Sequence, residues 1–455
     1  MNKVMLIYPY FLTNETKGQI FHPLGISVLS SGMKDKGLEV VKLDCTFLTI
    51  EEALKVAREF GADIIGIYIM TTMSQNALKL LETLRLISPQ SLFITGGPLP
   101  SLYPEKFAQK FDLVFRGEGA LSVPQFCFDY LEFAEKIAKK VNITENDRIS
   151  DFLNSRDINI YSGIYGYIND QKNINSEKTL VSVPEVNLSE EQIDRLKMTD
   201  RSGYDHKKYQ DLCFKSSGYK SATIMMTYGC PFDCDFCSKP IFGNKVRFRN
   251  MDSIFKEIQD IVRFGYDSLW IADDLFTLND HYIGAFCDRM NESDFKINWS
   301  CLSRVDSISD ETANKMKLAG CNKVYLGIES GSDEVLKIMN KHVDIKKVKR
   351  GVDIFKNQGI ECGGFFIVGY PGETIDTIET TFEFALSLGL DEISFNLPYP
   401  LPGSNLYNRV RDIKDDDWDF ENETKFLYKS EFDEVWLREK IKKTIEKHSL
   451  NKGQL

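Results

Sequence analysis

The chain contains two long stretches in which short apolar runs alternate with segments of helical periodicity. The first lies between residues 3 and 120 and the second between residues 221 and 400. Strand–helix–strand alternation predicts parallel strands joined by right-handed crossovers, since antiparallel strands need only short turns. The sequence therefore predicts an α/β protein with two parallel sheets, and ligands bind such sheets at the carboxyl ends of the strands.

The first stretch predicts a doubly wound sheet of about five strands. Its apolar runs are residues 3–8, 39–43, 62–70, 91–97 and 112–120. Three of the loops that follow these strands, together with a fourth near residue 117, contain small or polar residues that let a large ligand approach the backbone. The candidate binding residues in these loops are Tyr8, Pro9, Thr71, Thr72, Ser74, Gly96, Gly97, Pro98, Gly117 and Glu118.

The second stretch contains about six or seven strand–helix units, which is too few for an eightfold barrel. It predicts a partial (β/α)6 barrel whose site lies at the carboxyl ends of the strands. Polar residues end several of its apolar strands, and Gly369 follows another. These strand-end residues are Asp273, Asp274, Ser303, Arg304, Glu329 and Ser330. Because buried charges need partners, they indicate either a polar ligand or ion pairs between neighbouring strands.

The stretch TYGCPFDCDFC contains three cysteines within eight residues. Cys230, Cys234 and Cys237 have the spacing C-x3-C-x2-C, directly after an apolar run. Three thiolates without a fourth can hold an iron–sulfur cluster and leave one iron open for another ligand. The alternatives are a zinc site, which needs a fourth Cys or His, and a redox pair, which needs only C-x-x-C. No histidine lies between His206 and His281.

With Phe236 before its third cysteine, this stretch resembles the signature of the radical S-adenosylmethionine (SAM) enzymes. The later strings WIADDLF, LGIESGSDEVLKIMNK, FFIVGYPGET and PYPLPGS resemble the same family. The resemblance implies a 4Fe–4S cluster on the three cysteines, whose open iron chelates the amino and carboxyl groups of SAM. An electron from the cluster then cleaves SAM to methionine and a 5′-deoxyadenosyl radical.

The resemblance also assigns roles to the strand-end residues. Asp273 or Asp274 would meet the methionyl amino group, and Arg304, beside Ser303, would meet the carboxylate. Glu329 with Ser330 would bind the ribose or carboxylate, and Gly369 would let the backbone approach the adenine. No catalytic acid or base is identified.

The first stretch resembles the cobalamin-binding domain that precedes the radical domain in the cobalamin-dependent (class B) subgroup. The similarity rests on HPLG, DIIGIYIMTTMS, ITGGPLPSLYPE and FRGEGA. It implies a Rossmann-like cobalamin-binding sheet, with the loop residues above as cofactor contacts. A nucleotide- or flavodoxin-like sheet without cobalamin, or a domain that has lost its ligand, is the alternative.

His22 is a weak candidate for the lower axial ligand of cobalt. Cobalamin proteins that use a histidine there have D-x-H-x-x-G, and this chain lacks the aspartate that would orient the imidazole. We interpret His22 as preceding a helix with Pro23 in its first turn. Cobalt would then lack a histidine on its lower face, which suits transfer of a methyl group.

The expected domains are residues 1–134, a connector at 135–205, the radical SAM domain at 206–404 and a C-terminal cap at 405–455. The connector predicts a hairpin near residues 164–170 and a helix that starts after Ser189. The cap either covers the barrel mouth or selects the substrate.

Net charge, cysteine usage and apolar run lengths limit the cell compartment and the binding partners that we expect. The net charge of −11 disfavours a general nucleic-acid surface, and the basic group at Lys245, Arg247 and Arg249 is interpreted as a solvated edge. The seven cysteines outside the motif indicate buried free thiols in a reducing compartment. The N-terminal apolar run is too short for a signal peptide and no stretch approaches a membrane span. We therefore expect a cytoplasmic monomer.

The two resemblances together predict a methyltransferase that acts on an unactivated carbon. The radical would remove a hydrogen atom and methylcobalamin would deliver the methyl group. A cyclisation, rearrangement or other radical reaction is the alternative, and a sensor or scaffold without turnover is the third hypothesis. The expected partners are a small-molecule, lipid or peptide substrate and an external electron donor such as flavodoxin or ferredoxin.

Overall fold

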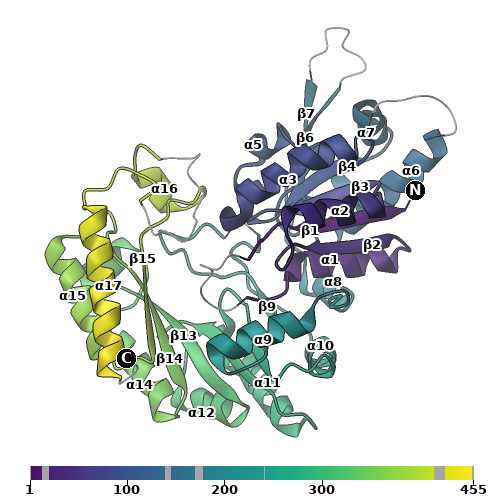
Figure 1. Ribbon diagram of the computed structural model, residues 1–455. Helices are drawn as coiled ribbons and strands as arrows, with labels where there is room; N and C mark the ends of the chain where they lie inside the picture. The colour runs from purple at the N-terminus through teal and green to yellow at the C-terminus, as the bar shows by residue number, and fades with distance from the viewer. Residues whose placement is uncertain are drawn as a thin grey trace.

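The computed structural model describes residues 2–12, 20–138, 145–169, 178–239, 241–413 and 426–452. The chain forms two α/β units, each built on its own sheet (Figure 1). The predicted α/β class and the order of the two units are confirmed.

The N-terminal sheet has seven strands in the order β2-β1-β3-β4-β5-β6-β7. Its parallel strands are β1 (Lys3–Tyr8), β2 (Glu39–Asp44), β3 (Ile64–Tyr68), β4 (Leu92–Gly96) and β5 (Leu113–Phe115). One face packs on α1 (Leu24–Asp35), α6 (Ser122–Ala138) and α7 (Glu145–Asn154). The other packs on α2 (Ile50–Phe60), α3 (Ser74–Ile87), α4 (Pro98–Leu102) and α5 (Pro104–Ala108). Helices on both faces make the sheet doubly wound, as predicted.

A pair of antiparallel strands extends this sheet beyond the expected five. β6 (Ile164–Asn169) pairs with β5 and with β7 (Lys178–Ser182). The hairpin predicted for the connector thus completes the N-terminal sheet by covering the edge of β5, although Asp170 in its expected turn lies outside the described residues. The expected boundary at residue 134 falls inside α6.

The second sheet has six parallel strands in the order β15-β14-β13-β12-β11-β8. They are β8 (Ser221–Ile224), β11 (Ser268–Ile271), β12 (Asn298–Ser303), β13 (Cys321–Glu329), β14 (Glu361–Ile367) and β15 (Glu392–Asn396). Its helices are α10 (Met251–Arg263), α11 (Asp280–Glu292), α12 (Asp310–Leu318), α13 (Asp333–Ile338), α14 (Ile345–Asn357) and α15 (Ile375–Ser387). This is the predicted partial barrel.

The remaining elements lie beside the barrel or between the units. They are α8 (Glu190–Asp194), α9 (His206–Ser217), β9 (Thr227–Tyr228), β10 (Arg247–Phe248), α16 (Asn405–Arg409) and α17 (Glu434–Asn451). α17 runs along the outside of the barrel against α15 and β15 (Figure 1). α9 packs on β8, and Tyr209 on α9 donates a hydrogen bond to Asp44 of the first sheet, Oη–Oδ2 2.7 Å.

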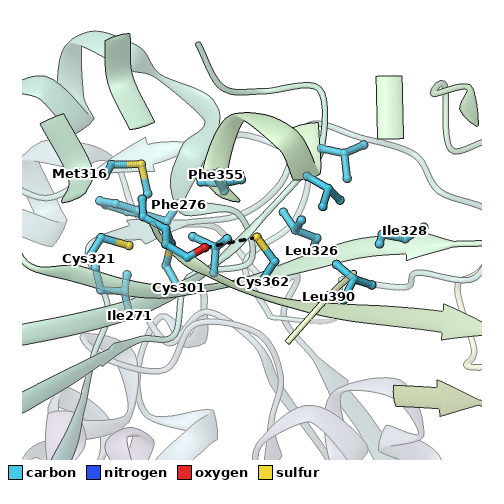
Figure 2. Packing of buried hydrophobic residues seen from close by; sticks show 14 of the residues in the cluster. Ile271, Phe276, Cys301, Met316, Cys321, Leu326, Ile328, Phe355, Cys362 and Leu390 are labelled. Atoms are coloured by element: carbon cyan, nitrogen blue, oxygen red, sulfur yellow. Dashed lines mark hydrogen bonds between the residues drawn. The ribbon is translucent and has the colours of Figure 1, made fainter. Parts of the chain in front are cut away.

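The barrel core lies between the outer face of the sheet and its helices. Figure 2 shows Cys301, Cys321 and Cys362 inside this core among Leu326 and Phe355. All seven cysteines outside the motif are buried and free, which confirms the expectation from the sequence. Their burial leaves the three motif cysteines as the accessible thiols of the described chain.

Candidate cofactor sites

The three motif cysteines lie on one loop, residues 229–246, between β9 and β10. We call it the cluster loop. The antiparallel pairing of β9 and β10 closes the base of the loop. Gly229 begins it with φ +85°, and a side chain there would collide with the carbonyl oxygens of Lys245 and Phe242. Only glycine fits this position, so the loop shape is encoded at its first residue.

Polar contacts hold the loop around the cysteines. The Lys239 ammonium donates to the carbonyl oxygens of Cys230, at 3.1 Å, and Phe232. The amide of Cys237 donates to the carbonyl of Cys234, N–O 3.0 Å. These bonds constrain the backbone of the loop at Cys230, Cys234 and Cys237.

The chemistry of this donor set fits a cluster. Burial raises the pKa of the Cys234 thiol, an effect that the nearby Lys341 ammonium opposes, and burial raises the pKa of Cys237 to about 11. Both thiols must lose a proton on metal binding. Among the described residues, no three His, Cys, Asp or Glu side chains are arranged to hold a single ion. A zinc site needs four close ligands, whereas three thiolates suit a larger iron–sulfur group.

Arg304 and Glu329 lie beside this loop. The Arg304 guanidinium stacks 3.8 Å from the ring centroid of Phe232 in the cluster loop. It also donates to the Lys341 carbonyl, at 2.8 Å, and pairs with Asp306, Nε–Oδ1 2.9 Å. Glu329 forms a buried ion pair with Lys341, Oε1–Nζ 2.7 Å. A cation and an anion therefore flank the cysteines, as binding of a zwitterionic amino acid requires.

Lys341 was not predicted from the sequence. It occupies the turn after α13, where Asn340 and His342 on either side have φ +52° and +59°. Asn340 donates to the carbonyl of Asp233 in the cluster loop, Nδ2–O 3.1 Å, and His342 contacts the Asp233 carboxylate at 3.3 Å. The left-handed backbone conformation of Asn340 and His342 places Lys341 in this turn. Hydrophobic periodicity does not reveal such a conformation, so Lys341 could not be predicted from the sequence.

The two neighbouring aspartates have different environments. Asp273 is fully buried, and its carboxylate accepts the amides of Met226 and Thr227 at 2.7 and 2.8 Å. Burial raises its pKa to about 7, although those two amides favour the charged form. Asp274 is exposed and faces the Gly229 amide. Of the pair, Asp274 is the one available to a ligand ammonium.

Three further predicted residues are engaged within the protein. Ser303 hydrogen-bonds Thr277, Oγ–Oγ1 2.7 Å, and Ser330 hydrogen-bonds Thr381, Oγ–Oγ1 3.1 Å. A side chain at Gly369 would meet Phe426 and Leu437 of the C-terminal segment at 2.7 and 2.9 Å. These positions shape the site through packing.

A cavity of about 610 Å³ lies between the two units. Its walls include seven of the ten residues predicted from the first sheet. These are Tyr8, Thr72, Gly96, Gly97, Pro98, Gly117 and Glu118, whereas Pro9, Thr71 and Ser74 do not line it. The barrel contributes Thr223, Met225 and Tyr228 on the opposite side. The volume is within the usual range for a cofactor site.

His22 lines this cavity but is held by neighbours from residues 204–266, well beyond the B12-binding sheet. Its Nε2 hydrogen-bonds Tyr266 Oη at 2.5 Å, and the rings of Tyr204 and Tyr209 lie 5.1 and 4.5 Å away. Burial, and then the charge of Arg201, lowers its pKa well below the usual value, so the ring is neutral. Its Nδ1 is buried without a partner, as is the Thr223 hydroxyl across the cavity. Two orphaned polar atoms in the walls fit a ligand that carries amide groups, as a corrin does.

The basic group at the end of the cluster loop is not a solvated edge. Arg247 is buried and pairs with Glu118 of the first unit, Nη2–Oε1 2.6 Å. Arg249 pairs with the buried Glu257, Nη1–Oε2 2.8 Å. That interpretation of both arginines was wrong, because each pairs with a buried carboxylate, Glu118 from the first unit or Glu257 from the following helix α10.

Comparison with known families identifies both units. A model described as "B12 binding domain" matches residues 12–126, and one described as "Radical SAM superfamily" matches residues 224–385. The chain carries a B12-binding domain followed by a radical SAM domain. The radical SAM domain contains the cluster loop and the strand ends beside it, and the B12-binding domain supplies one wall of the cavity.

Two solved structures share this two-domain fold. One is the radical SAM methyltransferase TsrM from Kitasatospora setae with cobalamin and a [4Fe–4S] cluster bound. Its TM-score is 0.70 at 17% identity, over 89% of this chain and 74% of TsrM. The other is the cobalamin-dependent SAM radical enzyme OxsB with aqua-cobalamin and SAM bound. Its TM-score is 0.68 at 18% identity, over 90% of this chain and 55% of OxsB.

Curated relatives match most of the chain. A Pyrococcus horikoshii protein named as an uncharacterized methyltransferase is 25% identical over 89% of this chain and 82% of its own length. Cytidylyl-2-hydroxyethylphosphonate methyltransferase of Streptomyces wedmorensis is 24% identical over 89% of this chain and 80% of its own. The anaerobic magnesium-protoporphyrin IX monomethyl ester cyclase of Rubrivivax gelatinosus is 26% identical, over 92% and 72%.

The chain is therefore an enzyme whose cofactors are a 4Fe–4S cluster, SAM and cobalamin. No described helix is long and apolar enough to cross a bilayer.

Proposed function

We propose that this enzyme methylates an unactivated carbon atom of its substrate. When bound, the cluster with SAM supplies a 5′-deoxyadenosyl radical that abstracts hydrogen, and cobalamin supplies the methyl group. Relatives named as methyltransferases that match nearly the whole chain support this assignment.

The observation that carries the proposal is the cavity shared by the two domains. Tyr228, two residues before Cys230, lines it from the radical SAM domain, and Gly96 and Gly97 line it from the B12-binding domain. The B12-binding loops would hold the corrin in this cavity, and Tyr228, Ile241 and Phe242 would connect its wall to the cluster loop, so one bound substrate would be served by both cofactors. Such proximity turns two encounters into one bound geometry.

The chain's own residues bind and orient. Arg304 would hold the carboxylate of SAM, Asp274 its ammonium, and Glu329 its ribose. Ser303, Ser330 and Gly369 would support the residues of that pocket through their contacts within the protein. Asp273 would fix the backbone at Met226 and Thr227, just before the cluster loop. In the B12-binding domain, the loops at residues 8–9, 71–74, 96–98 and 117–118 would hold the corrin.

The partners follow from this chemistry. An external donor such as flavodoxin or ferredoxin would reduce the cluster of a monomeric, cytoplasmic enzyme. The substrate would be a small molecule, a lipid or a peptide side chain. The net charge of −11 disfavours nucleic acid.

A second candidate is a cyclisation that uses the same cofactors. The similarity to the Rubrivivax cyclase over 92% of this chain favours it specifically. Methylation and cyclisation both begin with hydrogen abstraction, so only analysis of the products distinguishes the two reactions.

The test is turnover of anaerobic, reconstituted enzyme with reductant and SAM labelled in its methyl group. The enzyme should form 5′-deoxyadenosine and S-adenosylhomocysteine together, with label in a product carbon. Formation of 5′-deoxyadenosine without transferred label on an accepted substrate would exclude methylation and favour the cyclisation.

A further inference from the structure

Asp235 lies inside the cysteine motif, between Cys234 and Phe236, yet it is almost fully buried. Its carboxylate is hydrogen-bonded to residues outside the cluster loop. The Oδ2 atom accepts hydrogen bonds from Tyr370 Oη at 2.6 Å and from Arg409 Nη1 at 2.7 Å. Tyr370 is itself completely buried in the turn after β14, and Arg409 ends α16.

The backbone of Asp235 makes two more contacts with distant segments. Its amide donates to the Met339 carbonyl, N–O 2.9 Å, at the end of α13. Its carbonyl accepts the amide of Leu406 in α16, also at 2.9 Å. One residue of the motif therefore joins the cluster loop to three other parts of the chain.

A small apolar core surrounds these bonds. Val335, Met339, Tyr370 and Leu406 are its buried members, and Phe236 packs against them from the cluster loop. This core is separate from the main barrel core, so it forms only when α13, the turn after β14 and α16 come together. Apolar packing shields the Asp235–Tyr370 bond from water and strengthens it, because Tyr370 is completely buried.

The C-terminal segment also contacts the turn after β14 through residues 426–428. Tyr428 Oη donates to the Gly369 carbonyl, at 3.3 Å, and Phe426 fills the space beside Gly369. Arg409 also forms an ion pair with Asp235. The Arg409 side chain is 39% exposed, and the Asp235 side chain is 9% exposed. Half-exposed ion pairs contribute little stability alone, so Arg409 adds orientation more than fold stability.

We propose that Asp235 is a positioning residue that transmits the docking of α16 to Cys234 and Cys237. The C-terminal segment then supports the cluster site itself. This role differs from both covering the barrel mouth and selecting the substrate. Cys234 is directly bonded to Asp235, and Cys237 follows two residues later, so a fixed Asp235 limits the directions that both thiolates can take. This inference rests on the cluster chemistry of the proposed function but not on methyl transfer.

The test compares cluster retention in matched variants of the full-length protein. Arg409→Met and Tyr370→Phe each remove one partner of Asp235, and Arg409→Lys keeps the charge. Arg411→Met, two residues further on at an exposed position, is the control. After anaerobic reconstitution, iron release to a chelator is timed, and the EPR spectrum of the reduced cluster is recorded with and without SAM.

The Arg409→Met and Tyr370→Phe proteins should release iron about 10-fold faster, the scale expected when a group supporting a metal ligand is removed. The change that SAM causes in the EPR spectrum should broaden or disappear in both. Arg409→Lys should restore most of the retention and Arg411→Met should match wild type. Thermal unfolding of the three arginine-variant apoproteins should match that of wild type, because the Arg409 side chain is 39% exposed, and this separates positioning from folding.

Release rates and spectra of Arg409→Met and Tyr370→Phe equal to those of wild type would overturn the inference. The same holds if Arg411→Met releases iron as fast as Arg409→Met. Failure of the proposed function is distinguishable, because absent methyl transfer would leave iron release and the spectra of all variants measurable.

Discussion

At the scale of single residues, the buried Glu329–Lys341 pair is the most specific charge arrangement beside the cysteines. The Lys341 ammonium neutralises Glu329 through a bond to its Oε1 atom, at 2.7 Å. We expect Lys341→Met to leave the buried Glu329 carboxylate without its cation. SAM binding to the reconstituted protein should then weaken by at least about 10-fold. Calorimetric titration with SAM measures this effect.

Lys346→Met is the matched control, because Lys346 is exposed on α14. Its SAM affinity should equal that of wild type. Unchanged affinity in Lys341→Met would contradict the role given to the pair.

Glu373, in the turn after β14, gives a prediction about pH. One oxygen accepts the Tyr370 amide at 2.7 Å, the other is buried without a partner, and burial raises the pKa to about 7. The folded chain therefore holds this proton more tightly than the unfolded chain. The stability it contributes is complete below about pH 4.5 and is lost as pH rises through about 7.

Glu373→Gln keeps the accepting oxygen and stays neutral at every pH. Its unfolding free energy should therefore fall less than that of wild type between pH 5 and pH 8, by up to about 3 kcal/mol. Denaturant unfolding of the apoproteins at both pH values measures the difference. Parallel pH profiles of the two proteins would show that Glu373 is already ionised in the folded state.

The sequence predicted the strand-end residues better than it predicted what each side chain does. Arg304 and Glu329 flank the cysteines because parallel strands bring their carboxyl ends to one edge. Asp273, Ser303 and Ser330 stand at the same edge but bond to Met226, Thr277 and Thr381. Those partners come from other elements, so no local pattern could separate them from ligand-facing residues.

At the scale of elements, the loop after β4 owes its shape to Gly97. Its φ is +111°, and a side chain would lie 2.7 Å from the Ile69 carbonyl oxygen and 3.0 Å from the Tyr68 ring. We expect Gly97→Ala to displace this loop from the cavity wall and lower cobalamin retention after gel filtration.

Gly61→Ala is the control for backbone strain alone. Gly61 has φ +63° but no atom within 4 Å of the added carbon. It should lose about 1–2 kcal/mol of stability while retaining cobalamin fully. Equal cobalamin retention in both variants would show that the Gly97 loop does not contact the cofactor.

The parallel strands were predictable because each is an apolar run followed by a helix. The pairing of β6 with β5 was not, because strand partners depend on which sheet edge is open. α16 was also beyond prediction, since its role depends on Asp235, which lies 174 residues from Arg409.

At the scale of the whole molecule, many polar contacts join the two domains around the cavity. Glu118 of the B12-binding domain pairs with Arg247 of the radical SAM domain at 2.6 Å, and Asp200 of the connector pairs with Lys34 and Lys42 of the B12-binding domain at 2.7 and 3.1 Å. These ion pairs hold the connector and the radical SAM domain against the B12-binding domain. Resemblance of motifs predicted the two domains, but only the fold shows that residues of both domains line one cavity.

The central claim is that one chain holds a cysteine-bound cluster and a cobalamin at two separate sites. Iron, sulfide and cobalamin are therefore measured per chain in anaerobically reconstituted wild type and in a variant with Cys230, Cys234 and Cys237 all changed to Ala. The account predicts a 4Fe–4S cluster and cobalamin in the wild type, and cobalamin without iron in the variant. A wild type without an iron–sulfur cluster, or a variant that keeps its iron, would contradict it.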